Sequence, residues 1–83
     1  ARFDRDGLAN AYNNRGITYK KLGTKADLQK ALDDYSKAIE IWEELKKDPD
    51  ASFDRDGLAW AYDSRGVTYG KLGTKADLQK ALD

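Results

Sequence analysis

The chain is 83 residues long, its 15 basic residues balance its 15 acidic ones, and it contains neither cysteine nor histidine. This length allows one small domain at most, and the missing residue types exclude disulfides, thiolate or imidazole metal ligands and a histidine general base. No basic cluster exceeds a Lys-Lys pair and no apolar stretch approaches the roughly 20 residues that span a bilayer, so neither nucleic-acid binding nor membrane spanning is expected.

The chain contains two near copies of one segment. Residues 1–33 and 51–83 are identical at 27 of 33 positions, which gives a period of 50 residues. Such repetition is typical of repeat proteins, in which each unit buries its apolar face against a neighbour. We therefore expect a single repeat domain with a first repeat at 1–50 and a second, truncated repeat at 51–83. The close identity of the copies and the end within the second copy indicate an engineered or excised fragment.

Large residues spaced four and three apart predict a first helix over about residues 4–22. They form one stripe that we expect to be buried: Leu8, Tyr12, Arg15, Tyr19 and Leu22. Gly23 follows directly and suits a left-handed C-terminal cap. Gly16 lies inside the helix, where glycine costs about 1 kcal/mol relative to alanine, so it indicates the close approach of a partner backbone. We expect Arg15 to lay its stem over apolar neighbours and to meet a nearby carboxylate.

The strongest periodicity predicts a second helix over about residues 26–47. Its apolar stripe is Leu28, Ala31, Leu32, Tyr35, Ala38, Ile39, Trp42 and Leu45. Thr24 and Asp27 form a capping-box-like start, and Pro49 follows the predicted end. We expect this helix to be continuous and to be flanked by both of its neighbours.

The second copy predicts a third helix over about 53–72 and a helical stub over about 75–83. No strand pattern competes with these helices. Short turns between amphipathic helices force antiparallel neighbours, and repeated helix pairs stack side by side. The predicted fold class is therefore all-α, with antiparallel helix-turn-helix repeats stacked as a superhelix.

The residues of both copies resemble the tetratricopeptide repeat family. Its pattern of an aromatic residue, glycine four positions later and tyrosine three after that is matched twice, and its second-helix pattern once; the matching residues are Tyr12, Gly16, Tyr19, Tyr62, Gly66, Tyr69, Ala31, Tyr35 and Ala38. The resemblance implies a solenoid that binds proteins or peptides in a concave groove. Two features depart from the family: the period is 50 residues rather than about 34, and Arg15 and Arg65 occupy places that are usually apolar.

The two copies of the first predicted helix differ at five positions, which occupy a sector of roughly 120° opposite the shared stripe. In the resembled family that side lines the groove, so we predict a peptide- or partner-binding groove there. Its candidate residues are Asn10, Asn13, Asn14, Ile17, Lys20, Trp60, Asp63, Ser64, Val67 and Lys71. Two simpler interpretations stay open: solvent-facing residues drift freely, and Trp60 could instead cover the helix at 26–47. The family's carboxylate-clamp pattern is not matched, so chaperone tails are not expected as partners.

The truncated second repeat is expected to leave apolar surface uncovered, and such patches drive association. The candidate self-association residues are Leu58, Tyr62, Tyr69, Leu72, Leu78 and Leu82. We expect a non-catalytic scaffold without a cofactor, which binds a protein or peptide and forms homo-oligomers. The alternatives are a self-assembling building block with no outside ligand and, less favoured, a small-ligand or enzymatic domain that uses groove carboxylates and amides. Adjacent carboxylates such as Asp33 and Asp34 point apart on a helix, which argues against acid–base catalysis.

Overall fold

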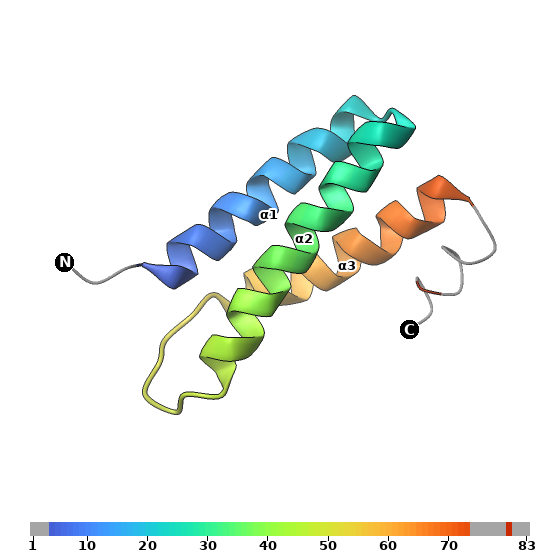
Figure 1. The fold of residues 1–83 in the computed structure, drawn as a ribbon. Coiled ribbons are helices and arrows are strands. Elements are labelled where there is room, and N and C mark those ends of the chain that lie inside the picture. Colours follow the sequence, from blue (N-terminus) through green and yellow to red (C-terminus); the bar gives the residue numbers. More distant parts are fainter. Residues whose placement is uncertain (1–3, 74–79, 81–83) are drawn as a thin grey trace.

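The computed structural model describes residues 4–73 and residue 80, and within them it contains three helices and no strand. They are α1 (Arg5–Leu22), α2 (Lys25–Lys46) and α3 (Arg55–Leu72) (Figure 1). The all-α prediction is confirmed, and the helix ends differ from the predicted ones by only one or two residues. The stub expected over about 75–83 lies outside the described residues, except for Lys80, which is helical.

The N-terminal caps repeat from the first unit to the second. Asp4 accepts a hydrogen bond from the backbone N–H of Gly7 at 2.8 Å, and Asp54 accepts the equivalent bond from Gly57 at 2.7 Å. A carboxylate in this place satisfies one of the unpaired N–H groups of the first turn and lies at the positive end of the helix dipole. The sequence copies are therefore also copies in local structure.

The predicted capping signals are confirmed. At the start of α2, Thr24 Oγ1 accepts a hydrogen bond from the backbone N–H of Asp27 at 3.1 Å and donates one to Asp27 Oδ2 at 2.7 Å. The C-terminal caps of α1 and α3 are Gly23 and Gly73, with φ of 78° and 72°. Glycine adopts this left-handed conformation without strain, so both helices stop at a defined residue and α2 can turn back along α1.

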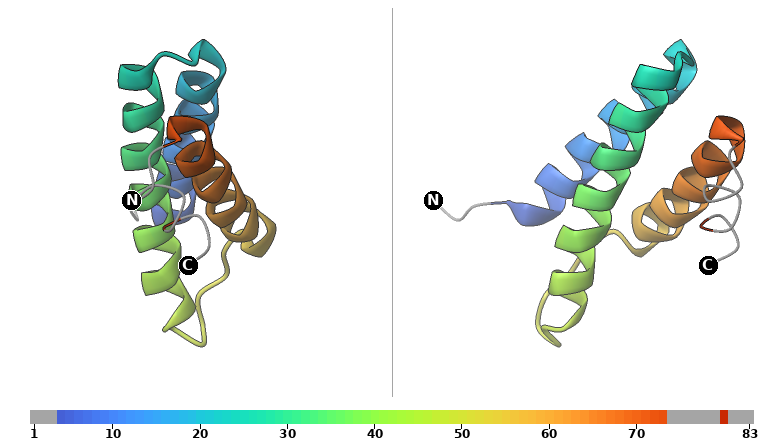
Figure 2. Two further views of the ribbon diagram at one scale, coloured as in Figure 1. Left: turned by 90° about the vertical axis from the view of Figure 1, so that its right-hand side faces the viewer. Right: turned by 45° about the vertical axis from the view of Figure 1, so that its right-hand side comes forward.

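α2 packs against both α1 and α3, which lie on one side of it and make few direct contacts with each other (Figures 1 and 2). α1 and α2 form an antiparallel hairpin, and the loop at residues 47–54 returns the chain so that α3 runs back along α2 beside α1 (Figure 2). The prediction of a continuous second helix flanked by both neighbours is confirmed. This packing is consistent with a helical repeat.

The core is formed by large residues from α2 and small ones from its neighbours. Trp42 and Tyr35 are fully buried, while the buried residues of α1 are Ala9, Asn13 and Gly16. α3 buries a similar strip, which consists of Gly57, Leu58, Ala61, Ser64 and Thr68. Large side chains can pack closely only where the facing helix is narrow, so α2 contributes most of the buried volume.

The buried face of α1 is not the predicted stripe. Leu22 is 63% exposed and Arg15 is also exposed, while the other three members of the stripe are half-buried. The buried strip, Ala9, Asn13 and Gly16, is displaced by roughly one residue step, or about 100°, around the helix. The prediction was wrong because it counted large residues, whereas Trp42 and Tyr35 of α2 need small residues opposite them.

Candidate partner-binding surfaces

Three contacts fix α2 on α1, and the first is an ion pair. The guanidinium of Arg15 donates to both carboxylate oxygens of Asp34, with Nε–Oδ2 at 2.9 Å and Nη2–Oδ1 at 2.8 Å. The Asp34 side chain is 3% exposed, whereas that of Arg15 is 56% exposed. The hydrogen bond to Asp34 raises the pKa of Arg15 above its already high value. Because a buried carboxylate needs a charged or polar partner, Arg15 determines where Asp34 can lie.

The second contact joins a glycine to an aromatic ring. A Cβ placed on Gly16 would lie 2.8 Å from Cε1 of Tyr35, closer than real contacts allow. The absence of a side chain at Gly16 therefore makes room for the ring. The sequence predicted a close approach here, but the group that approaches is a side chain and not a backbone. Burial raises the pKa of Tyr35, and Ser64 and Thr68 of α3, which lie beside its hydroxyl, lower it in part.

The third contact is a hydrogen-bond junction at Asp6. Its Oδ1 accepts the indole N–H of Trp42 at 2.8 Å and the backbone N–H of Asp54 at 3.0 Å. One carboxylate of α1 thus holds α2 and the N-terminal cap of α3 together. No pattern in the sequence singles out this residue, although Asp6 and Trp42 both stand within predicted helices. Only their three-dimensional placement, 36 residues apart in the chain, shows the pairing.

Two tyrosines of α1 lie beside these contacts, and lysines of α2 cover their rings. The ammonium group of Lys37 lies 5.4 Å from the ring centroid of Tyr12, and that of Lys30 lies 5.6 Å from the ring centroid of Tyr19. Such cation–π contacts cover the ring faces with the stems of the lysines. We define the helix-binding face of α1 by its polar, aromatic and glycine contacts with α2, that is, Asp6, Tyr12, Arg15, Gly16 and Tyr19.

α3 carries the same five residue types at the same spacing. We name this set the copy face of α3, and its members are Asp56, Tyr62, Arg65, Gly66 and Tyr69. α3 contacts α2 mainly through its other side, the strip that contains Ala61 and Ser64. On the copy face Asp56 and Tyr62 are exposed, and the other three residues are half-buried.

Two members of the copy face reach the edge of α2. The hydroxyl of Tyr62 donates to Glu43 Oε1 at 2.9 Å, and Nη1 of Arg65 donates to Ser36 Oγ at 3.4 Å. Partial burial and the Glu43 contact raise the pKa of Tyr62. Among the described residues, Arg65 has no carboxylate partner that corresponds to the partner of Arg15.

The predicted groove residues do not share one face. Asn13 of α1 is 5% exposed, and Ser64 of α3 is 1% exposed. These two are therefore core residues and are not accessible to a ligand in this structure. Of the remaining positions on α1, Asn14 is exposed, while Asn10, Ile17 and Lys20 are half-buried.

On α3 the remaining predicted groove residues form an exposed strip: Trp60, Asp63, Val67 and Lys71. Trp60 is 60% exposed and Val67 is 45% exposed, so Trp60 does not serve as a cover for α2. The strip lies beside the copy face, because Asp63 stands three residues before Gly66 and Trp60 stands four residues after Asp56, which makes them neighbours on the helix surface.

The predicted self-association residues also separate into different environments. Leu58 is 9% exposed and belongs to the core, so its assignment to an uncovered patch was wrong. Tyr62 is 44% exposed, and Tyr69 and Leu72 are half-buried. Leu78 and Leu82 lie outside the described residues.

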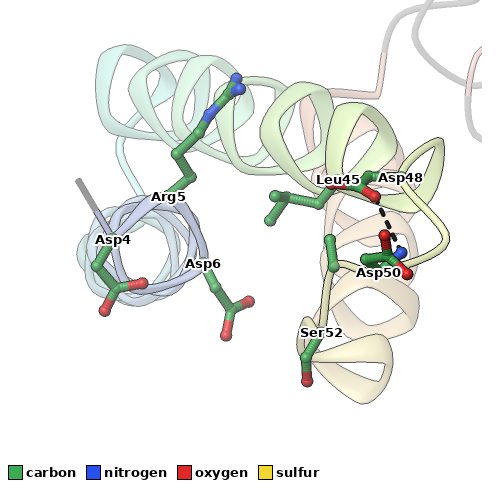
Figure 3. Close-up of a pocket in the computed structure, with 8 residues that line it drawn as sticks. Asp4, Arg5, Asp6, Leu45, Asp48, Asp50 and Ser52 are labelled. Atoms are coloured by element: carbon green, nitrogen blue, oxygen red, sulfur yellow. Dashed lines mark hydrogen bonds between the residues drawn. The ribbon is translucent and has the colours of Figure 1, made fainter. Parts of the chain in front are cut away.

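An acidic hollow of about 400 Å³ lies between the start of α1 and the loop after α2. Figure 3 shows Asp4 and Asp6 on one side, Asp48 and Asp50 on the other, and Leu45 between them. The backbone N–H of Asp50 donates to Asp48 Oδ1 at 2.9 Å. Within residues 4–73 and 80, no three acidic residues are arranged so that they could hold a metal ion.

Comparison of the chain with protein-family models, with curated proteins and with solved structures gave no match. None of the helices in the described part of the chain combines the length and the apolar character that crossing a membrane requires.

Proposed function

We propose that this chain is a non-catalytic helical repeat scaffold of the tetratricopeptide type, which binds proteins or peptides or assembles with copies of itself. The observation that carries the proposal is the duplication of an interface. The helix-binding face of α1 holds α2, and the copy face of α3 presents the same residue types at the same spacing.

The arrangement of the helices supports a stacked architecture. α2 packs one continuous face, which includes Tyr35 and Trp42, against both α1 and α3, so a further hairpin could be added beyond α3 in the same way. Under the proposal, repetition of this step generates a superhelix. The pitch of this superhelix would differ from that of the resembled family, because the helices are longer and the period is 50 residues.

A self-assembling building block without an outside ligand is the second candidate. It is favoured by the exposed apolar side chains on and beside the copy face, Tyr62, Trp60 and Val67. Exposed apolar residues gathered on one helix are typical of interaction surfaces. In this case the occupant of the surface would be another molecule of the same chain.

Sedimentation velocity tests the proposal when it is combined with titration of amphipathic helical peptides. We expect either concentration-dependent association in the micromolar range, about −8 kcal/mol at a Kd of about 1 μM, or saturable peptide binding by the monomer. A folded monomer that neither associates nor binds any such peptide, including one with the sequence of α2, contradicts the proposed function.

A further inference from the structure

We propose that the copy face of α3 binds a separate helix whose side chains follow the pattern of residues 34–42 in α2. This pattern is an aspartate, a tyrosine directly after it, alanine and isoleucine four and five positions after the aspartate, and a tryptophan eight positions after it. The inference rests on the proposed function and names the class of ligand.

The chain itself supplies the template for this recognition. On α1, Arg15 binds the aspartate, Gly16 makes room for the tyrosine ring and Asp6 accepts the indole N–H. The copy face has Arg65, Gly66 and Asp56 at the equivalent positions, each shifted by 50 residues. A helix that satisfies the first set of groups therefore carries the groups that the second set requires.

A second contact indicates the register in which such a helix would lie. The ammonium group of Lys80 lies 5.5 Å from the ring centroid of Tyr69, as that of Lys30 lies 5.6 Å from the ring centroid of Tyr19. Residues 74–83 repeat residues 24–33, whereas the segment at 34–46 occurs once in the sequence. The groups that fit Arg65, Gly66 and Asp56 belong to that single segment.

The helix-binding face of α1 and the copy face of α3 differ at one central position. A substitution there should strengthen helix binding. Asn13 lies buried beneath α2, and its counterpart in α3 is Asp63, which is exposed. Docking of a helix would bury the Asp63 carboxylate, and burial of an unpaired charge is unfavourable. The copy face should therefore bind its helix more weakly than α1 binds α2, and Asp63→Asn should strengthen binding.

The experiment is a calorimetric titration of the 83-residue chain with a synthetic peptide of residues 34–47, because Lys80 already lies on Tyr69 as Lys30 lies on Tyr19. Because the free peptide must fold on binding, we expect a Kd on the order of 10 to 100 μM. Asp63→Asn should lower this Kd about tenfold, since it removes a buried unpaired charge. Gly66→Ala should raise it about tenfold or more, because a methyl group would meet the incoming tyrosine ring as it would at Gly16.

Gly70→Ala is the matched control, because a Cβ at Gly70 has no atom within 4 Å and the substitution adds one methyl group to the same helix. It should leave the Kd unchanged, and circular dichroism of each variant reports whether α3 is intact. Trp42→Phe in the peptide should weaken its binding to the unmodified chain. It should not weaken binding to the Asp56→Ala variant any further, because the indole N–H and the Asp56 carboxylate would form one hydrogen bond.

Two results would overturn the inference. Peptide binding that Gly66→Ala and Asp63→Asn both leave unchanged would place the ligand elsewhere. If the peptide does not bind at concentrations at which the chain self-associates, this ligand is rejected and the proposed function stands. If neither peptide binding nor self-association occurs, the proposed function fails as well.

Discussion

Gly16→Ala tests the packing of α2 on α1 directly. The new Cβ would lie 2.8 Å from Cε1 and 3.0 Å from Cδ1 of Tyr35, and the ring is fully buried, so it cannot swing into solvent. Overpacking of this kind costs about 1 to 3 kcal/mol. Alanine regains about 1 kcal/mol of helix propensity. The expected net change is therefore a loss of up to about 2 kcal/mol in the free energy of unfolding.

The assay is urea unfolding followed by circular dichroism at 222 nm, with Gly70→Ala as the control. Gly70 is exposed and its Cβ would have open space, so the control should gain up to about 1 kcal/mol from helix propensity alone. The two Gly→Ala changes should thus have opposite signs. If Gly16→Ala stabilises the chain as much as Gly70→Ala does, Tyr35 does not pack against Gly16 and this account of the interface is wrong.

Three further substitutions or conditions test the polar contacts. Arg15→Gln should lower the midpoint of urea unfolding, because the buried Asp34 carboxylate loses its charged partner; an unchanged midpoint would contradict this. Trp42→Phe and Asp6→Ala should each destabilise, and a double-mutant cycle should give a coupling of about 1 kcal/mol; strictly additive effects would show that the 2.8 Å hydrogen bond contributes nothing. The free energy of unfolding should fall as pH rises above the ordinary tyrosine pKa of 10.0, because the folded state keeps the Tyr35 proton to a higher pH than the unfolded state does. In thermal melts recorded over this pH range, Tyr35→Phe should flatten the decline.

Local sequence signals predicted the helices well because each signal acts within a few residues. The Thr24 capping box and the left-handed Gly23 are confirmed, and they fix the hairpin turn between α1 and α2. Arg15 also meets a carboxylate and an aromatic neighbour, as its long amphipathic side chain led us to expect; its guanidinium lies 5.6 Å from the Tyr12 ring centroid. These features depend on chemistry that a single helix already carries.

The side of α1 that is buried could not be predicted from that helix alone. It depends on Trp42 and Tyr35, whose size selects the narrow strip at Ala9 and Gly16 in preference to the stripe of larger residues. The buried place of Asn13 was missed for the same reason. Asn13 and Ser64 were expected on a ligand surface because the two copies differ there, but differences between repeats also arise where one copy of a residue is covered and the other is not.

The most direct test of a second helix-binding face is a two-dimensional ¹H–¹⁵N NMR spectrum of the labelled 83-residue chain during titration with the unlabelled peptide of residues 34–47. We expect the shifted amide signals to cluster along the copy face, around Asp56, Arg65 and Gly66, while those of Ala9 and Gly16 stay in place. Shifts that instead follow the acidic hollow at Asp48 and Asp50, or a spectrum that does not change at millimolar peptide, would contradict the claim that α3 presents a second helix-binding face.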